Sequence, residues 1–166
     1  MMIFMSTQRF VTPDGVGLAV HEIGEGRPVL LLHGFMSSAR ANWFSPRLAQ
    51  ALAAAGHRVI APDCRGHGDS DAPVEPGAWP PDVMTDDVLA LVRGLELEDF
   101  DLAGYSMGAR TAVRACARGL RPRRLVTGGM RLVSPLAATF PARSPRRMID
   151  GVFASPEFAA VPQASL

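Results

Sequence analysis

The chain has 166 residues, a net charge of +1, and 48% hydrophobic and 20% charged residues. This length favours one domain with a sizeable core. The small net charge excludes a broad field that would attract nucleic acid or an anionic membrane. The first residues lack the basic lead and long apolar run of a signal peptide, and no later stretch is long enough to span a bilayer. We therefore expect a cytoplasmic protein.

The predicted elements alternate between strand and helix along most of the chain. Residues 9–26 predict two short strands around a Pro-Asp-Gly turn. Short apolar runs predict further strands over residues 27–34, 57–63, 99–106 and 123–129. Helical spacing of apolar residues predicts helices over residues 42–56, 84–95 and 107–118.

This alternation predicts an α/β fold with a mostly parallel sheet and helices on both of its faces. Sites in such sheets form at the carboxyl ends of the strands. We therefore expect the chemistry to lie just after Leu32, Ile60 and Gly104. The composition changes after Met130, where prolines recur and no helix or strand period is clear. We interpret residues 131–166 as an irregular tail rich in Pro, Arg and Ser.

The pentapeptide Gly-Tyr-Ser-Met-Gly stands between a predicted strand and a predicted helix. The pattern alone is a weak signal, but in this context it predicts a sharp turn that holds Ser106 in a strained backbone conformation. Side chains at Gly104 and Gly108 would collide in such a turn. The Met107 amide begins the helix and is well placed to bind an oxyanion, and the Phe35 amide is the best candidate for a second donor.

The segments LLLHGF, DCRGHGDSD and GYSMG occur in the order and rough spacing found in the α/β-hydrolase superfamily. The chain resembles this family over about residues 8–130, and esterase-like, lactonase-like and perhydrolase-like members most of all. The resemblance implies an α/β-hydrolase fold truncated after about the sixth strand, with residues 1–130 as its N-terminal part. It also implies that Ser106 is the nucleophile and that the Phe35 and Met107 amides form the oxyanion hole.

Further roles follow from the same resemblance. His33 and Gly34 would shape the oxyanion loop, and residues 63–70 would form a structural turn after the fourth strand. The triad of the family runs Ser, acid, His in chain order. No histidine follows Ser106 in this chain, and the acids that do follow it, Asp150 and Glu157, lie in the tail.

The histidines all precede the pentapeptide. His33 is expected to orient the oxyanion loop and not to act as the base, and His67 is a weaker candidate still. His21 and His57 are expected at ordinary strand edges. The cysteines Cys64 and Cys116 have no metal or redox spacing, so we expect buried or half-buried thiols. No metal or cofactor site is predicted.

The sequence thus predicts a serine hydrolase for an ester, lactone or related acyl bond of a small molecule. We expect little activity from this chain by itself, because the triad histidine and a clear acid are missing. Three interpretations stay open: a hydrolase made incomplete by truncation or a shifted reading frame, a non-catalytic remnant or binding module, and a half-site completed by a partner chain. We expect no nucleic-acid or membrane partner, and an unpaired sheet edge would favour self-association.

Overall fold

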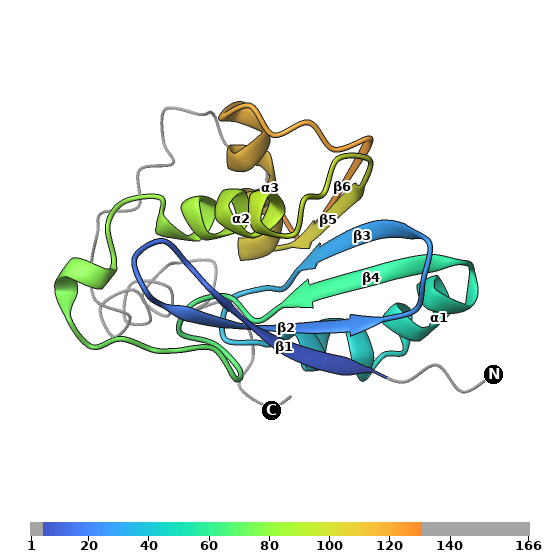
Figure 1. The fold of residues 1–166 in the computed structure, drawn as a ribbon, viewed down its shortest axis with the longest axis horizontal. Coiled ribbons are helices and arrows are strands. Elements are labelled where there is room, and N and C mark those ends of the chain that lie inside the picture. Colours follow the sequence, from blue (N-terminus) through green and yellow to red (C-terminus); the bar gives the residue numbers. More distant parts are fainter. Residues whose placement is uncertain (1–4, 131–166) are drawn as a thin grey trace, which may run out of the picture. The chain divides into compact units, whose positions relative to one another are not determined.

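The described residues, 5–130 of a computed structural model, form a six-stranded mixed sheet with helices (Figure 1). Its strands are β1 (Ser6–Val11), β2 (Gly17–Ile23), β3 (Arg27–Leu32), β4 (His57–Pro62), β5 (Asp101–Tyr105) and β6 (Arg124–Gly128). They lie in the order β1-β2-β4-β3-β5-β6. The β1–β2 and β2–β4 pairs are antiparallel, whereas the β4–β3, β3–β5 and β5–β6 pairs are parallel. The predicted α/β class and its six strands are confirmed.

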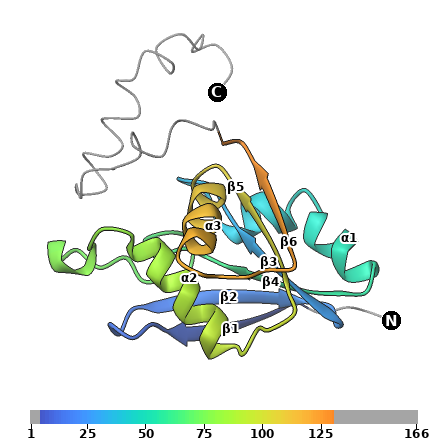
Figure 2. The same ribbon diagram turned by 90° about the horizontal axis from the view of Figure 1, so that it is seen from above.

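Helices cover both faces of this sheet. The short π-helix η1 (Arg40–Phe44) and helix α1 (Leu48–Ala54) lie on one face, and α2 (Val83–Gly94) and α3 (Met107–Ala117) lie on the other (Figures 1 and 2). The 3₁₀ helix η2 (Pro76–Ala78) belongs to a separate compact unit.

The helix predicted over residues 42–56 is divided in two. Pro46 lacks an amide hydrogen and cannot continue a helical ladder, and Arg47 adopts φ +64 before α1 begins. The end predicted at Gly56 is correct, since α1 stops at Ala54 and Gly56 has φ +83.

The continuous apolar runs of the central strands fill two cores. Successive side chains of a strand point to opposite faces, so Leu30 and Leu32 of β3 pack toward α2 and α3. Val29 and Leu31 of the same strand pack toward η1 and α1. A strand covered on both faces needs apolar residues at every position, which explains why the run is not interrupted by polar ones.

The parallel register brings three strand ends to one edge of the sheet. Leu32 of β3 pairs with Gly104 of β5, and Tyr105 of β5 pairs with Gly128 of β6. The segments that follow β3 and β5 therefore leave the sheet beside one another. This edge is the place where the sequence predicted the chemistry.

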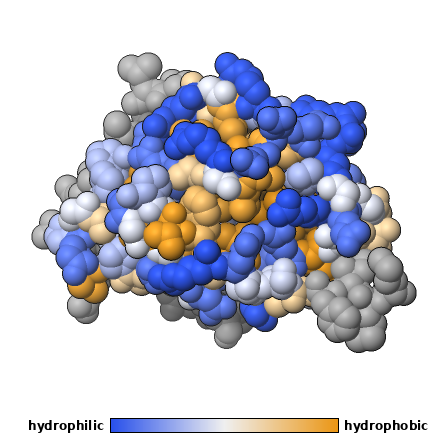
Figure 3. Space-filling view, in the orientation of Figure 1, coloured by the Kyte–Doolittle hydropathy of each residue, from blue (hydrophilic) through white to orange (hydrophobic). Residues whose placement is uncertain are grey.

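Between residues 5 and 130, no helix is both long and apolar enough to cross a membrane. Polar residues cover much of the face shown in Figure 3, and apolar residues gather near its centre. Cys64 is buried and Cys116 is half-buried, and both are free thiols, as predicted. The tail over residues 131–166, with Asp150 and Glu157, lies outside the described residues.

Candidate active site

Ser106 occupies a sharp turn between β5 and α3. Its backbone has φ +52 and ψ −109, a combination that non-glycine residues rarely adopt. Its amide donates a 2.8 Å hydrogen bond to the Gly128 carbonyl at the end of β6, and its carbonyl accepts one from Arg110 in α3. Three elements therefore hold the strained residue in place.

The two glycines of the pentapeptide are required because backbone passes close to both. A Cβ on Gly104 would lie 2.4 Å from the Gly108 oxygen, and a Cβ on Gly108 would lie 2.1 Å from the Leu32 oxygen. Real Cβ atoms do not approach backbone this closely, so no side chain fits at either position. The glycines let the first turn of α3 sit directly on the ends of β5 and β3.

The loop after β3 runs beside Ser106. A Cβ on Gly34 would lie 3.5 Å from Ser106 Cβ and 3.2 Å from the Tyr105 ring. Phe35 follows in a turn and is half-buried. Met107 is the first residue of α3, so its amide has no acceptor within the helix. The turn and the loop thus bring the Phe35 and Met107 residues to the same strand ends as the Ser106 hydroxyl.

His33 is fully buried, and both of its ring nitrogens bond to the main chain. The Cys64 amide donates to Nε2 at 2.9 Å, so this nitrogen carries no proton. The other nitrogen, Nδ1, is therefore protonated and donates to the Gly34 carbonyl at 2.7 Å. Burial and the nearby His67 lower the pKa of His33, against the opposing effects of the Gly34 carbonyl and Asp63. The imidazole is neutral and holds the loop, and it has no free lone pair for a proton.

His67 also bonds elsewhere. The His67 Nδ1 lies 3.0 Å from the Arg65 carbonyl, and its ring packs edge-on against Phe35 and His33. His57 begins β4. His21, expected at a strand edge, is instead fully buried within β2, which is paired on both sides. Within residues 5–130, no histidine makes a hydrogen bond to the Ser106 hydroxyl.

A family model for the alpha/beta hydrolase fold matches residues 27–148. The chain belongs to the α/β-hydrolase fold family. The match includes every residue that we assign to the turn at Ser106 and to the loop after β3.

Relatives of this α/β-hydrolase agree with the assignment. The AB hydrolase superfamily protein YisY of Bacillus subtilis is 41% identical over 107 residues, which are 64% of this chain and 38% of the relative. An epoxide hydrolase of Caballeronia sordidicola is 37% identical over 114 residues, 69% of this chain and 33% of the relative. The structure of an esterase from Exiguobacterium antarcticum matches with a TM-score of 0.66 and 29% identity, over 74% of this chain and 44% of that one. The chain thus spans less than half of each.

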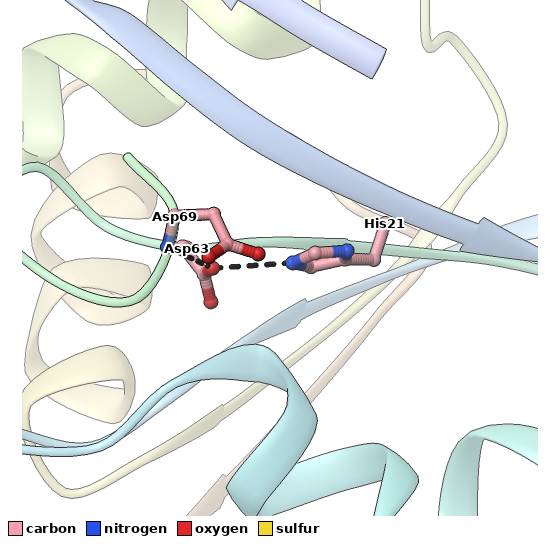
Figure 4. Close-up of side chains that lie close together, drawn as sticks. All are labelled: His21, Asp63 and Asp69. Carbon is pink, nitrogen blue, oxygen red and sulfur yellow. Dashed lines mark hydrogen bonds and ion pairs between the residues drawn. The ribbon is translucent and has the colours of Figure 1, made fainter. Parts of the chain in front are cut away.

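The turn after β4 of this α/β-hydrolase is built around Asp63. One carboxylate oxygen accepts from the Ala39 amide at 2.7 Å, and the other accepts from the Asp69 amide at 2.9 Å and lies 3.1 Å from Nε2 of His21 (Figure 4). Burial alone would raise the pKa of Asp63, but the two amides and the imidazole hold it below its usual value. Asp63 thereby ties β4, β2 and the start of η1 together.

His21, Asp63 and Asp69 are also of the types that bind metal ions, and one ligand atom from each lies within 4.8 Å of the others. The carboxylate of Asp63 already accepts hydrogen bonds at both oxygens, and Nδ1 of His21 lies 2.9 Å from Thr7 Oγ1. The hydrogen bonds of these three residues therefore indicate a structural role for them.

Arg65 supports the same turn from the opposite side. Its side chain is 1% exposed and contacts Asp87 of α2 through two nitrogens, at 3.0 and 2.7 Å, and Asp14 at 2.7 Å. The hydrogen bonds from Arg65 and Thr12 lower the pKa of Asp14 to about 2. Burial raises the pKa of Asp87 in spite of the arginine beside it.

Two residues near the site were not singled out by the sequence. Asn42 accepts a 2.8 Å hydrogen bond from the Gly34 amide, and Asp87 pairs with Arg65. Neither belongs to a short motif: Gly34 lies 8 residues from Asn42, and Arg65 lies 22 residues from Asp87. An asparagine within an otherwise apolar helical stretch was the only available signal, because this residue disfavours helix interiors unless its side chain bonds elsewhere.

Proposed function

We propose that Ser106 is the nucleophile of a hydrolase that cleaves an ester, lactone or related acyl bond. The observation that carries this proposal is the strained backbone of Ser106, at φ +52, on a turn that tolerates only glycine two residues before it, at Gly104, and two residues after it, at Gly108. Strain of this kind persists where the surrounding structure maintains it, and it concentrates at functional sites. Here it presents one hydroxyl at the carboxyl edge of a largely parallel sheet.

The proposed oxyanion hole consists of the Met107 and Phe35 amides. When a serine oxygen attacks an acyl carbon, the carbonyl oxygen gains negative charge, and amide donors stabilise it. One such donor contributes about 3–4 kcal/mol to the transition state. The first amide of α3 also lies at the positive end of the helix dipole. His33 and Gly34 shape the loop that carries the Phe35 amide.

The chemistry of serine favours an acyl substrate over an epoxide, although several relatives are named epoxide hydrolases. Attack of a serine oxygen on an acyl carbon gives an ester, which water can cleave in a second step. Attack on an epoxide carbon would give an ether, which has no carbonyl for water to attack. Turnover through Ser106 therefore requires an acyl group, as in the relative named an esterase.

The base that would activate Ser106 is not among the histidines of residues 5–130, because none of them bonds to its hydroxyl. Removing the triad from a serine hydrolase leaves only about 10³–10⁴-fold acceleration over water. We therefore expect negligible steady-state turnover by this chain. An acyl group placed on Ser106 should also persist, because deacylation needs the same base.

A trapping experiment tests this proposal. The protein is incubated with p-nitrophenyl acetate at mildly alkaline pH, and acetylated peptides are identified by mass spectrometry. We expect acetylation at residue 106 in the wild type and none at that position in Ser106→Ala. The control Ser45→Ala, which removes an exposed serine, should leave the acetylation of Ser106 unchanged. Absence of acetyl at Ser106 would refute the proposal that this serine reacts in the isolated chain. Rapid turnover that depends on Ser106 would refute the expectation that the base is missing.

A fluorophosphonate probe distinguishes the remaining interpretations. Labelling of Ser106 in the isolated chain indicates an activated nucleophile. Labelling that appears only after a second protein is added favours a site completed by a partner. No labelling under either condition favours a non-catalytic binding module.

A further inference from the structure

The Gly34 peptide groups decide which amide the loop after β3 can offer to an oxyanion. Gly34 lies beside the nucleophile, since a Cβ on it would be 3.5 Å from Ser106 Cβ. The loop therefore carries two consecutive amides close to the nucleophile, those of Gly34 and Phe35. The directions of these two N–H groups therefore decide which of them can serve as a donor.

Asn42 takes up the Gly34 amide. Its Oδ1 accepts from the Gly34 N–H at 2.8 Å, and the facing atom has to be the oxygen because its partner is a donor. Gly34 is buried, so this amide would otherwise lack an acceptor within the described residues. The peptide that precedes Gly34 is thereby fixed, with its N–H turned toward η1.

His33 fixes the peptide that follows. Its Nδ1 donates to the Gly34 carbonyl at 2.7 Å. That carbonyl and the Phe35 N–H belong to one planar trans peptide, in which the two bonds point in opposite directions. Holding the oxygen on the buried His33 ring therefore turns the Phe35 N–H away from that ring. The two side chains lock two consecutive peptide planes.

The π-turn explains how Asn42 reaches the loop. The Ser45 amide donates to the Arg40 carbonyl five residues earlier, which closes η1, and the neighbours Trp43 and Phe44 are buried in the core below. Upstream, the Ala39 amide donates to Asp63. Asn42 is thus anchored on both sides, and its carboxamide is free to accept from a residue outside its own turn.

We propose that Asn42 is a positioning residue of the oxyanion loop, which occupies the Gly34 amide and leaves the Phe35 amide as the second donor. This inference rests on the proposed function of Ser106. Asn42 acts through the loop and is not expected to touch the substrate. Its loss would release the Gly34 peptide and let the loop place its donors in more than one way.

Two variants and one control test the proposal by amide hydrogen exchange, followed by NMR. In Asn42→Ala the Gly34 amide should exchange at least about tenfold faster than in the wild type, because its acceptor is gone. In Asn42→Asp it should stay protected, since a carboxylate oxygen can accept the same bond. Arg40→Ala, on the exposed start of the same turn, should not change it. Unchanged Gly34 exchange in Asn42→Ala would overturn the proposal.

The acetylation of Ser106 supplies the second measurement. Asn42→Ala should slow it by about 10- to 100-fold, the scale expected when a donor moves by a fraction of an ångström to one ångström. Amide exchange of the core strands serves as the check that each variant is folded. Equal acetylation of Asn42→Ala and wild type would overturn the positioning role. If the wild type is not acetylated at all, the proposed function fails, and the Gly34 exchange still decides whether Asn42 holds this amide.

Discussion

At the scale of single residues, His33 shows how a titratable group can be made structural. Each ring nitrogen has a defined partner, the Cys64 amide for one and the Gly34 carbonyl for the other. Protonation of Nε2 would place two donors opposite each other in a buried site. Burial, and after it the nearby His67, lowers the pKa of His33, against the opposing effects of the Gly34 carbonyl and Asp63.

This residue predicts a pH dependence of stability. In the unfolded chain a histidine titrates near pH 6.5, whereas folded His33 stays neutral to lower pH. Below about pH 6.5 the unfolded state binds the extra proton, so the free energy of unfolding should fall as the pH is lowered toward the folded pKa. Urea unfolding of wild type and His33→Gln at pH 8, 7, 6 and 5 measures this.

The glutamine variant isolates the effect because it can accept from the Cys64 amide but does not titrate. At pH 8 the difference between the two proteins reports the cost of the substitution itself. From pH 7 to pH 5 the wild type should lose more stability than His33→Gln. Equal losses would show that His33 titrates alike in both states. Asp63 acts in a separate pH range. Its lowered pKa contributes stability that is lost only below about pH 4.

At the scale of elements, the buried Arg65 joins the turn after β4 to α2. Asp87 of α2 is buried and accepts hydrogen bonds from two nitrogens of the Arg65 guanidinium group. Asp14, on the turn between β1 and β2, is about half-exposed. A buried charge pair of this kind contributes little net stability compared with apolar residues, but losing one partner is costly. The pair therefore fixes where α2 attaches to the turn.

Arg65→Met should lower the free energy of unfolding by about 3 kcal/mol, because the Asp87 carboxylate is left buried without a partner. The double variant Arg65→Met with Asp87→Leu should recover most of this loss. Arg27→Met, which removes an exposed pair with Asp99, serves as the control and should cost less than about 1 kcal/mol. Urea unfolding at pH 7 measures all of these. A double variant as unstable as the single one would contradict the role of the unpaired carboxylate.

The elements themselves were largely predictable, and the exceptions have physical reasons. Uninterrupted apolar runs predicted the central strands because both of their faces are covered. In α3 the larger Val113 is 37% exposed, whereas Ala109, Ala112 and Ala115 are buried. Small residues let the helix approach the sheet closely, and hydrophobicity alone does not reveal that preference.

The candidate site was predictable only where its residues follow one another in the chain. The pentapeptide around Ser106 and the segment at His33 carry their pattern locally, because a tight turn restricts neighbouring positions. The partner of Asn42 lies 8 residues away, and those of His21 lie 14 and 42 residues away, and none of these separations follows a recognised spacing. Tertiary contacts of this kind require coordinates.

At the scale of the whole molecule, β6 ends the sheet in the described part of the chain, where it pairs only with β5. Four of its five residues are exposed, among them Leu125 at 40% and Val126 at 63%. An exposed edge with apolar side chains offers unpaired backbone groups to another strand.

We therefore predict that the chain associates with itself as its concentration rises. Val126→Lys, which places a charge on the exposed edge strand, should shift this association to higher concentration, because charged edges disfavour strand pairing. Val11→Lys, an exposed position on β1 at the opposite end of the sheet, is the matched control. Sedimentation over a range of concentrations measures both. A chain that stays monomeric throughout, or equal effects of the two substitutions, would contradict association through β6.

The hydrogen bond from the Ser106 amide to the Gly128 carbonyl limits how far this chain can be shortened. The backbone conformation of Ser106 is set partly by a residue more than twenty positions downstream. The shortest fragment that keeps this conformation must therefore extend through Gly128. A fragment that ends before Gly128 would keep the whole Gly-Tyr-Ser-Met-Gly motif and still lack the hydrogen bond that holds the turn in its conformation.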